Sequence, residues 1–470
     1  MAKMASLRGL QMKLILLLFI LSLIIASKSI VEFTEYDQQP KPDGLHPQNN
    51  RIYGHQINDS TLPFERPHDP SCSRFSEMSN ILVVVKTGAT ESYARIPTQL
   101  VTVLRCLPDF LIFSDMEQRI AGYRVHDTLD TVLPKVTEGN TDFDLYRRQQ
   151  TCIVDQQACN DNSGHNQVFD GWRLDRYKNI HTAEKAYHLR PDYDWYLFID
   201  ADTYVLWNNL VQWLSKLKKP SEKHHYIGST TLIDDFHFAH GGSGYILSQA
   251  TMKHLAVTHS GLANQYDMKA KELCCGDYVL GLALNKTLGI GLEHAWPTIN
   301  GENPHTIPYG PREWCHPLVT MHHMDPEDVS SDLYNQFVAS KLLSRRDDWD
   351  NLSEDVFYLD PKRRDSFPQW QQNKDRIPKL NQLASIQAVE MDAHKSFEDC
   401  RKMCESVQTC FQFSYHNGAC AYNRSFKLGK PTAKAKKQDD KMVSGWNIER
   451  IRSWDEAMGP CKKPVWPDID

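Results

Sequence analysis

Apolar runs alternate with amphipathic stretches through the middle of the chain. Three runs are rich in β-branched and aromatic residues, which is typical of buried strands: Asn80–Val85, Phe110–Phe113 and Tyr193–Ile199. Helical spacing of apolar positions occurs at about 95–104, 176–188 and 206–217. Strand and helix patterns that follow one another in this way predict a mainly parallel α/β sheet with helices on both faces.

Polar segments separate this region from its flanks. Residues 28–75 contain repeated prolines and 362–379 are strongly charged, and neither stretch has a period of 2 or 3.6, so both are expected to be linkers. Beyond the second linker, Ser396 opens a short helix pattern, residues 411–415 alternate as a strand, and the lysine-rich stretch 427–441 is expected to be a solvated loop. These patterns predict a second, small α+β domain.

The N-terminus contains a candidate membrane segment. Lys3, Arg8 and Lys13 precede the apolar run Leu14–Ala26. The run is short for a span, which typically needs about 20 residues, and a cleaved signal peptide is the alternative. We expect an uncleaved anchor, with the leading positive charges in the cytosol and the rest of the chain in the secretory lumen.

Composition agrees with a lumenal globular protein. The 12 cysteines include Cys400, Cys404, Cys410 and Cys420, close together near the C-terminus. In an oxidising compartment we expect disulfides there; a zinc site is disfavoured because no Cys-x-x-Cys pair occurs and no histidines repeat at ligand spacing. A net charge of −6 gives no support to nucleic-acid binding. Four Asn-x-Ser/Thr sequons occur, at Asn58, Asn285, Asn351 and Asn423.

The strongest chemical signal is Asp200-Ala201-Asp202, which directly follows the Tyr193–Ile199 strand. Ligands of open α/β sheets bind outside the carboxyl ends of the strands. Paired carboxylates at that edge suit a divalent cation that keeps positions open for substrate phosphates, as in a sugar nucleotide. An ordinary strand-to-turn junction is the alternative.

Three further segments carry candidate chemistry. The glycine-rich stretch 240–248 lets the backbone approach a ligand closely, although a plain turn would have the same composition. Asp277 opens an apolar helix and is either a catalytic carboxylate or a first-turn acid. His322, in Met321–Pro326, is either a metal ligand or a structural histidine.

The order of these segments resembles glycosyltransferase family 31, the inverting β-1,3-type transferases, notably the core 1 galactosyltransferase and fringe branch with its fungal and plant relatives. The similarity covers roughly residues 78–345. The matching segments are Val85–Gly88, Asp200–Val205, Gly241-Gly242-x-Gly244-Tyr245, Asp277 with Gly281, and His322-x-x-Asp325-Pro326. Two departures stand out: Ala201 occupies the middle of what is usually three aspartates, and Gly276 replaces the glutamate before the catalytic aspartate, which leaves Asp277 without a neighbouring carboxylate in sequence.

The resemblance implies a fold, a reaction and a set of site residues. It implies a GT-A-like domain, a UDP-sugar donor carrying galactose, glucose or N-acetylglucosamine, and Mn²⁺ or another divalent cation. The acceptor would be a hydroxyl of a glycan or glycoprotein, with a β-1,3 linkage expected. The implied residues are Asp202 and His322 on the metal, Asp200 near the metal or ribose, Asp277 as general base, Thr87, Gly88 and Asp115 at the nucleotide, and Gly241, Gly242 and Gly244 near donor and acceptor.

The C-terminal cysteines carry a second resemblance. The spacing of Cys400, Cys404 and Cys410, followed by aromatic residues up to Tyr415, is similar to a PAN/apple module, a class that binds proteins or carbohydrates. A disulfide-bonded cap on the transferase domain is the alternative.

Together these expectations give a single-pass type II Golgi or secretory-pathway protein. The expected segments are a cytosolic tail at 1–13, an anchor at 14–27, a stem at 28–76, the GT-A-like domain at 77–345, a linker at 346–385 and the PAN/apple-like domain at 386–465. A catalytically inert carbohydrate- or protein-binding scaffold is the competing hypothesis. A glycosidase using Asp200 and Asp202 fits poorly, because carboxylates two residues apart on a strand share a face and cannot flank one sugar.

Overall fold

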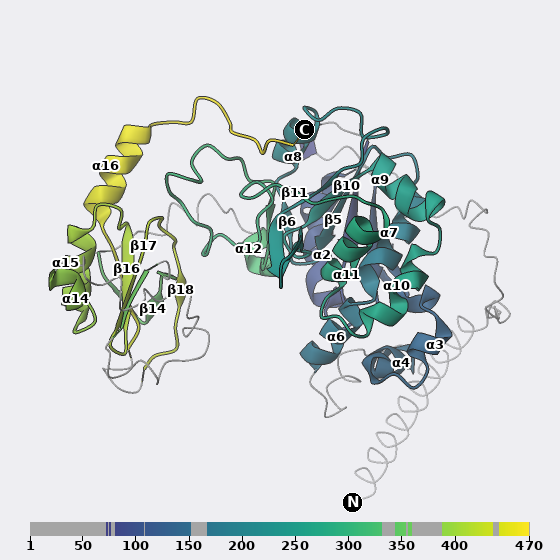
Figure 1. Ribbon diagram of the computed structural model, residues 1–470, viewed down its shortest axis with the longest axis horizontal. Coiled ribbons are helices and arrows are strands. Elements are labelled where there is room, and N and C mark those ends of the chain that lie inside the picture. Colours follow the sequence, from purple (N-terminus) through teal and green to yellow (C-terminus); the bar gives the residue numbers. More distant parts are fainter. Residues whose placement is uncertain are drawn as a thin grey trace, which may run out of the picture. The chain divides into compact units, whose positions relative to one another are not determined.

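The computed structural model describes residues 72–73, 75–76, 80–107, 109–151, 167–330, 344–353, 356–359, 388–435 and 441–469 (Figure 1). All of them belong to one unit, Asp59–Asp470. The expected anchor Leu14–Ala26 and most of the expected stem lie outside the described residues. Among the helices that are described, none combines the length and apolar character needed to cross a bilayer.

A large mixed sheet with a parallel centre organises the fold. Its strand order is β11-β7-β10-β5-β1-β2-β4-β3. The strands are β1 Ile81–Lys86, β2 Phe110–Ser114, β3 Gln118–Ile120, β4 Tyr123–Asp127, β5 Trp195–Asp200, β7 Tyr226–Gly228, β10 Tyr245–Ser248 and β11 Glu293–His294. β1 runs parallel to β2 and β5, whereas β10 is antiparallel to β5 and β7. The mostly parallel α/β sheet predicted from the sequence is therefore confirmed.

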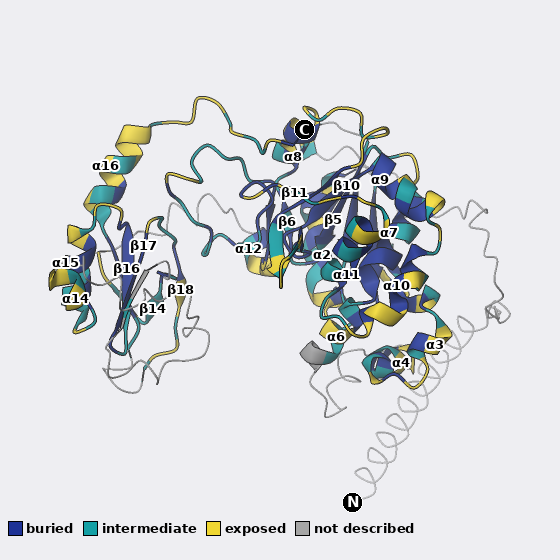
Figure 2. Ribbon diagram, in the orientation of Figure 1, coloured by how far each residue is buried: buried dark blue, intermediate teal, exposed yellow. Residues whose placement is uncertain are grey.

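Helices cover both faces of this sheet. They are α2 Ser92–Val101, α3 Pro134–Thr137, α4 Asp144–Thr151, α6 Gln167–Asp175, α7 Lys178–Leu189, α8 Trp207–Leu214, α9 Gln249–Lys253, α10 Leu262–Ala270, α11 Gly276–Leu282 and α12 Pro326–Ser330. Successive strand residues point to opposite faces. Accordingly, Leu82 and Val84 of β1 pack with residues of α7, α10 and α11, while Ile81, Val83 and Val85 pack with α2 and α8. Both faces are buried, as Figure 2 shows for β5 and β10.

The register of the central strands brings polar residues together at one edge. Lys86, the last residue of β1, pairs with Asp200, the last residue of β5. The Thr87 N–H donates to the Phe113 carbonyl of β2 at 2.9 Å. Because β1, β2 and β5 are parallel, their carboxyl ends lie side by side, and the loops that follow them meet there.

Two small pairings extend this edge. β6 Tyr204–Val205 runs antiparallel to β12 Thr320–Met321, which joins the segment after Asp202 to the segment before His322. β8 Thr230–Ile233 and β9 Phe236–Ala239 form a hairpin next to the end of β7. The hairpin contributes residues to the pocket described below, and the β6–β12 pairing is flanked by two others, Asp202 and His322.

The C-terminal part forms a second sheet with the order β13-β19-β16-β17-β15. Its strands and the neighbouring elements are β13 Arg346–Asp347, β14 Trp349–Asp350, β15 Val356–Leu359, α14 Ala388–Met391, α15 Phe397–Ser406, β16 Gln412–His416, β17 Ala419–Asn423, β18 Lys430–Pro431, β19 Val443–Trp446 and α16 Ile448–Met458. Ser396 caps α15 by accepting from the Asp399 N–H, as the sequence suggested. β13, β14 and β15 fall in the stretch where we expected a linker, and they pair with strands near the C-terminus.

Disulfides hold this sheet and its helix together. Cys400 pairs with Cys420 and Cys404 with Cys410, so the expected disulfide framework is present. The first bond joins α15 to β17, and both cystines are buried in one apolar cluster with Phe413. Such cross-links compensate for the small core that a domain of this size can build.

After α16 the chain returns to the core of the large sheet. Cys461 is disulfide-bonded to Cys315, the Trp466 ring stacks on Trp213 of α8 at 6.3 Å, and Ile469 is only 4% exposed. Ile469 belongs to the same apolar cluster as β1, α2 and α8, and the chain end lies beside α8 in Figure 1. The last residues therefore complete the core of the large sheet.

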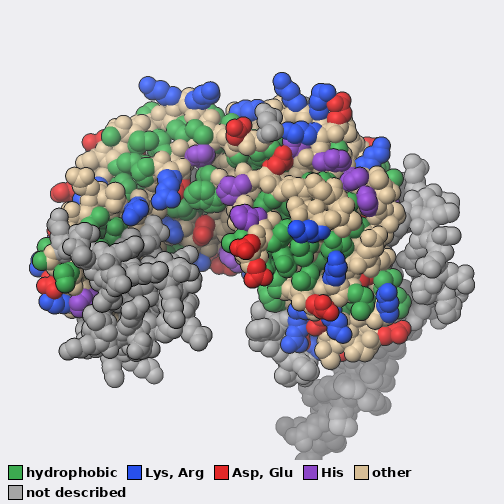
Figure 3. All heavy atoms as spheres, in the orientation of Figure 1, with side chains coloured by type: hydrophobic (Ala, Val, Ile, Leu, Met, Phe, Trp, Pro, Cys, Tyr) green, Lys and Arg blue, Asp and Glu red, His purple; other side chains and the backbone are tan. Residues whose placement is uncertain are grey.

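Among the described residues visible in Figure 3, acidic and basic side chains are interspersed, without a broad field of one sign. That distribution agrees with the modest net charge. These described residues form no broad basic face of the kind that binds a polyanion.

Ile469→Ala should lower the free energy of unfolding by about 2 kcal/mol or more, because it removes buried apolar atoms from the core. Val465→Ala is the matched control, because Val465 is 46% exposed and should change stability by less than about 0.5 kcal/mol. Urea denaturation measures both variants. Equal effects would contradict the assignment of the chain end to this core.

Candidate functional site

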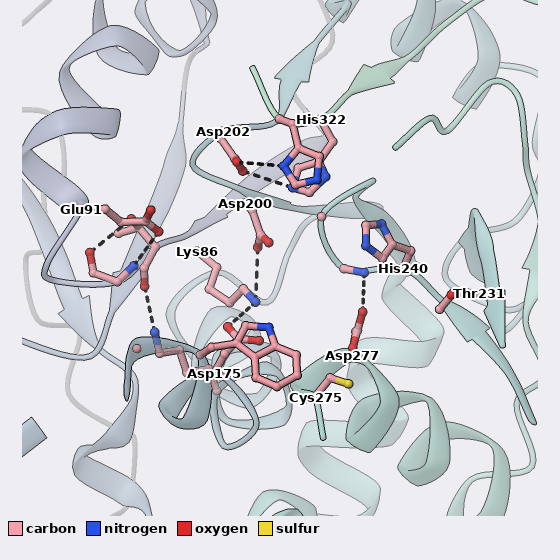
Figure 4. A pocket seen from close by; sticks show the side chains of 18 of the residues that line it. Lys86, Glu91, Asp175, Asp200, Asp202, Thr231, His240, Cys275, Asp277 and His322 are labelled. Atoms are coloured by element: carbon pink, nitrogen blue, oxygen red, sulfur yellow. Dashed lines mark hydrogen bonds and ion pairs between the residues drawn. The ribbon is translucent and has the colours of Figure 1, made fainter. Parts of the chain in front are cut away.

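A polar pocket of about 690 Å³ lies at the carboxyl edge of the sheet, in the range typical of ligand sites. Residues from β1, α6, β5, the β8–β9 hairpin, the glycine-rich loop, α11 and the segment after β12 line it. Figure 4 shows the labelled side chains converging on one space: Asp202 and His322 lie at one end, with Asp175, Asp277 and Cys275 at the other.

Lys86 is the central charge of this pocket. Its Nζ lies 2.6 Å from Asp175 Oδ1 and 3.3 Å from Asp200 Oδ1. Burial opposes the charged form, but the two carboxylates outweigh it and hold the pKa of Lys86 well above its usual range. Lys86 thus remains a cation and connects the end of α6 to the ends of β1 and β5.

The turn after β5 is fixed by buried hydrogen bonds. Gln99 of α2 donates from Nε2 to the carbonyls of Ala201 and Thr203, both at 2.9 Å. Thr203 Oγ1 donates to the Gly242 carbonyl at 2.7 Å. The turn that carries the two aspartates is therefore tied to the glycine-rich loop and cannot be a freely moving junction.

Asp202 faces two histidines. His322 Nε2 is 3.3 Å from Asp202 Oδ1, and His323 Nδ1 is 3.8 Å from Asp202 Oδ2. The three residues form a group whose ligand atoms lie within 4.8 Å of one another. His323 has φ 55°, a left-handed conformation that non-glycine residues rarely adopt. This backbone turn allows consecutive histidines to approach the same carboxylate.

These residues fit a divalent transition-metal ion. Two imidazole nitrogens and a carboxylate are a suitable donor set, and His322 Nδ1 is buried without a hydrogen-bond partner. Burial alone would raise the pKa of Asp202. The hydrogen bond to His322 and the charges of His322 and Arg95 have the larger, opposite effect, so the pKa of Asp202 lies below its usual value. The resemblance implied Asp202 and His322 on the metal and Asp200 near the metal or ribose, and it gave His323 no role. Asp200 is not in this group and instead pairs with Lys86, a neighbour that disfavours a second cation.

Gly242 makes room for His322. A Cβ at this position would lie 2.2 Å from Cε1 and 2.4 Å from Nε2 of the His322 ring, far inside van der Waals contact. Gly244 has φ 83°, which favours glycine, and it ends the loop before β10. The glycine-rich loop therefore serves close packing around the histidine as well as the turn.

Asp277 lies in the first turn of α11, as predicted from the sequence. Its Oδ2 accepts from the Gly241 N–H and its Oδ1 from the Tyr278 N–H, both at 2.8 Å. Burial raises the pKa of Asp277 above its usual value, against the opposing effects of Gly241 and Lys86. A carboxylate held in one orientation with raised basicity is suited to accept a proton.

The end of α6 packs directly against the start of α11. A Cβ on Gly276 would lie 2.4 Å from the Asp175 carbonyl oxygen, so the residue that replaces the family's glutamate must be small. Asp277 nevertheless has a carboxylate neighbour in space, Asp175; burial is the main cause of the raised pKa of Asp277, and the charge of Asp175 adds to it. Cys274 and Cys275 immediately before Gly276 form a disulfide with one another.

The charges of the pocket are unbalanced. The lining contains five carboxylates against two lysines. The carboxylates belong to Glu91, Asp175, Asp200, Asp202 and Asp277, and the lysines are Lys86 and Lys178. An anionic ligand could enter such a site only with a cation that offsets this excess.

Most of the residues implied by the resemblance meet in this pocket. Thr87, Gly88, Asp200, Asp202, Gly241, Gly242, Asp277 and His322 all line it. Asp115 and Gly244 do not: Asp115 is fully buried beneath the β1 loop, where its Oδ1 accepts from the Ala89 N–H at 2.7 Å and lies 3.4 Å from Lys178 Nζ.

Sequence reasoning missed several lining residues. No role is assigned to Lys86 from the sequence, although a lysine at the end of an apolar strand is itself a signal. None is assigned to His323 either. Trp172 and Asp175 lie on α6, and no motif in the sequence marks either of them.

Comparison with known families agrees with this geometry. Residues 76–297 match the family model described as Fringe-like. The Fringe-like family is a family of glycosyltransferases, whose members generally use a UDP-sugar and a divalent cation and work in the Golgi and secretory pathway. The match includes β1, α6, the Asp200–Asp202 turn, the glycine-rich loop and Asp277, and it supports a transferase.

Gly242→Ala should weaken Mn²⁺ binding by about 10- to 100-fold, because the new methyl group displaces His322 from Asp202. Gly291→Ala is the control: a Cβ there meets nothing within 4 Å. Isothermal titration calorimetry with Mn²⁺ compares the two, with circular dichroism to verify folding. Unchanged Mn²⁺ affinity in the Gly242 variant would exclude His322 from the metal group.

Proposed function

We propose that this protein is an inverting, metal-dependent glycosyltransferase that moves a hexose or N-acetylhexosamine from a UDP-sugar to a hydroxyl of a glycan or glycoprotein, with a β-1,3 linkage expected. The observation that carries the proposal is the content of one pocket: a group able to hold a divalent cation at one end and the oriented, buried carboxylate of Asp277 at the other. The Fringe-like match over residues 76–297, which includes Asp202 and Asp277 but ends before His322 and His323, supports it.

Asp202, His322 and His323 would hold Mn²⁺ or a similar cation. Such an ion, when bound, would neutralise the diphosphate and the charge that develops on the departing UDP. The excess of carboxylates supports this requirement, because without a cation the pocket repels a nucleotide diphosphate. The ion pair with Lys86 orients Asp200 beside this group, and Thr87 and Gly88 would lie at the nucleotide.

Asp277 would act as the general base. Its two backbone hydrogen bonds leave the carboxylate oriented, with lone pairs available for an acceptor hydroxyl. As the hydroxyl oxygen forms a bond to the anomeric carbon, its proton passes to Asp277 and the bond to UDP breaks with its electron pair on the phosphate oxygen. Attack from the face opposite UDP inverts the anomeric centre.

The C-terminal sheet would be a PAN/apple-like module that binds glycan or protein near the acceptor. Its support is the spacing of the cysteines together with the two cystines that fasten α15 to the sheet. We further propose a type II topology in the Golgi, with the Leu14–Ala26 segment as an uncleaved anchor. The five disulfides among the described cysteines support residence in an oxidising compartment.

Asp277→Asn should lower kcat by about 10² to 10⁴, the usual contribution of a general base. Binding of the UDP-sugar should hardly change, because the substitution leaves the metal group intact. Calorimetry of UDP-sugar binding, measured beside turnover, separates an effect on binding from an effect on catalysis. Asn is the chosen replacement because it is also well tolerated at a helix N-terminus. Normal turnover per folded molecule would show that Asp277 is only a first-turn acid.

If Asp277 is the general base, its protonation determines how kcat/KM depends on pH. A base must be deprotonated to act, and burial raises the pKa of Asp277. The acidic limb of kcat/KM should therefore lie above pH about 3.9, the ordinary aspartate value, and it should disappear in the Asp277→Asn variant.

Asp202→Ala should abolish both Mn²⁺ binding and turnover, whereas Asp200→Ala should lose turnover but retain Mn²⁺ binding, because only Asp202 lies in the histidine group. Calorimetry with Mn²⁺ and an assay of UDP release from UDP-galactose, UDP-glucose and UDP-N-acetylglucosamine measure both properties. Full activity in EDTA would contradict the metal requirement. Donor binding without turnover of any donor would instead favour a non-catalytic scaffold.

A further inference from the structure

The structure distinguishes the Asn-x-Ser/Thr sequons of this chain from one another. Asn285, Asn351 and Asn423 lie among the described residues, and Asn58 lies outside them. None of the four has proline in the middle position, so the sequence alone treats them as equal acceptors for N-glycosylation. The surroundings of the asparagine amide separate the three that are described.

Asn351 is a buried structural amide with an exposed fraction of 0%. Its Nδ2 donates to the carbonyls of Phe413 at 3.0 Å and Gly445 at 3.2 Å, which lie opposite one another on β16 and β19. Its Oδ1 accepts from the hydroxyl of Ser353, the last residue of the same sequon. Both polar atoms of the amide are therefore satisfied inside the protein. A saccharide on Nδ2 would have to break these bonds and open the sheet.

Asn423, the last residue of β17, is buried in the same way, with 1% exposed. Its Nδ2 donates to the Leu352 carbonyl at 3.4 Å, and its Oδ1 accepts from Ser425 Oγ at 3.3 Å. Again the serine of the sequon bonds to the asparagine of the sequon. The fold thus uses both motifs of the C-terminal sheet as internal hydrogen-bonding groups.

Asn285 has a different environment. α11 continues into the π-helical segment η6 Ala283–Thr287, in which Asn285 is only half-buried and the next two residues, Lys286 and Thr287, are exposed. Within the described part of the chain, the amide of Asn285 makes no hydrogen bond. Gly289, exposed and with φ 69°, follows in the turn after the helix. This sequon therefore occupies the surface end of a helix, where an attached chain can extend into solvent.

The attachment point also lies away from the pocket. Asn285 follows Asp277 by eight residues, which is roughly 10 Å along a helix. Cys275 and Asp277 line the pocket from the start of α11, and Asn285 is not among the lining residues. A saccharide at Asn285 is therefore attached at the far end of the helix that carries Asp277.

We infer that Asn285 carries an N-linked oligosaccharide and that Asn351 and Asn423, although they have the same motif, do not. The amide nitrogen of Asn285 would form a bond to the anomeric carbon of a lipid-diphosphate-linked oligosaccharide and lose one proton. The bond from that carbon to the diphosphate would break with its electron pair on the diphosphate. The inference rests on the lumenal location that belongs to the proposed function.

The timing of the modification does not remove the distinction. Glycans are attached while the chain enters the lumen, so Asn351 or Asn423 could be modified before the C-terminal sheet forms. A chain modified there could not bury the amide, and the pairing of β16 with β17 and β19 would be blocked. The folded protein should therefore contain neither modification.

The test uses the full chain, expressed in a eukaryotic secretory host and purified in folded form. Peptide N-glycosidase in ¹⁸O-labelled water converts each glycosylated asparagine into a labelled aspartate, which peptide mass spectrometry identifies. Asn285 should be labelled, whereas Asn351 and Asn423 should remain unlabelled asparagines. The peptide that contains Asn58 is read separately, so its state does not affect the result.

Variants of the sequon test the same assignment. Asn285→Gln and Thr287→Ala should each lose one glycan, seen as an increase in electrophoretic mobility that disappears after enzymatic deglycosylation. Thr287→Ser is the matched control, because it keeps both the sequon and the hydroxyl that lies 2.8 Å from Tyr266 Oη, and it should keep the glycan. Asn351→Gln and Asn423→Gln should leave the number of glycans unchanged and lower the urea midpoint, because each disrupts buried hydrogen bonds.

The outcomes separate this inference from the proposed function. Unmodified Asn285 in protein whose Cys315–Cys461 disulfide has formed would overturn the inference and leave the lumenal location in place. Unmodified Asn285 together with reduced cysteines would refute the lumenal location as well. A glycan on Asn351 or Asn423 of the folded protein would contradict the argument from burial. UDP-sugar turnover, measured on the same preparation, tests the transferase function independently.

Discussion

The ion pairs of Lys86 are the constraint on which the site depends. A lysine at the end of a buried strand would be costly without partners, and it has two, Asp175 at 2.6 Å and Asp200 at 3.3 Å. Both pairs are partly buried, so removing either carboxylate would leave a lysine charge that solvent compensates only in part. Through these contacts one cation fixes the end of α6 and the end of β5 against β1.

Both ends of the pocket, the Asp202–His322 group and Asp277, are connected to Lys86. On one side the Asp200 turn continues into Asp202 and pairs through β6 and β12 with the histidine segment. On the other side Asp175 lies against Gly276, so the position of α6 limits the position of Asp277. Close packing also positions these side chains, because Gly241 and Gly242 have no side chain and allow Asp277 and His322 to approach the glycine-rich loop. The strand ends and helix ends that carry Asp202, His322 and Asp277 therefore determine how these side chains lie in the pocket.

Much of this could be predicted from the sequence, because the signals are local. Apolar runs gave the central strands, and Asp277 was placed correctly at a helix start. What could not be predicted depends on register and on contacts distant in sequence. The pairing of Lys86 with Asp200 follows from strand register, and Asp175 and Trp172 lie on a helix whose sequence carries no motif. Likewise, the approach of His323 to Asp202 depends on a left-handed backbone at His323 that a histidine pair does not reveal.

Inversion requires a single displacement in which Asp277 accepts the proton of the acceptor while UDP departs from the opposite face of the sugar. The stereochemistry of the product tests this most directly. Proton NMR of the glycoside formed from an α-linked UDP-sugar, recorded early in the reaction with Mn²⁺ present, reports the configuration of the new anomeric centre. We predict a β-linked product. An α-linked product would show retention, and it would contradict the role of Asp277 as the base of a direct displacement.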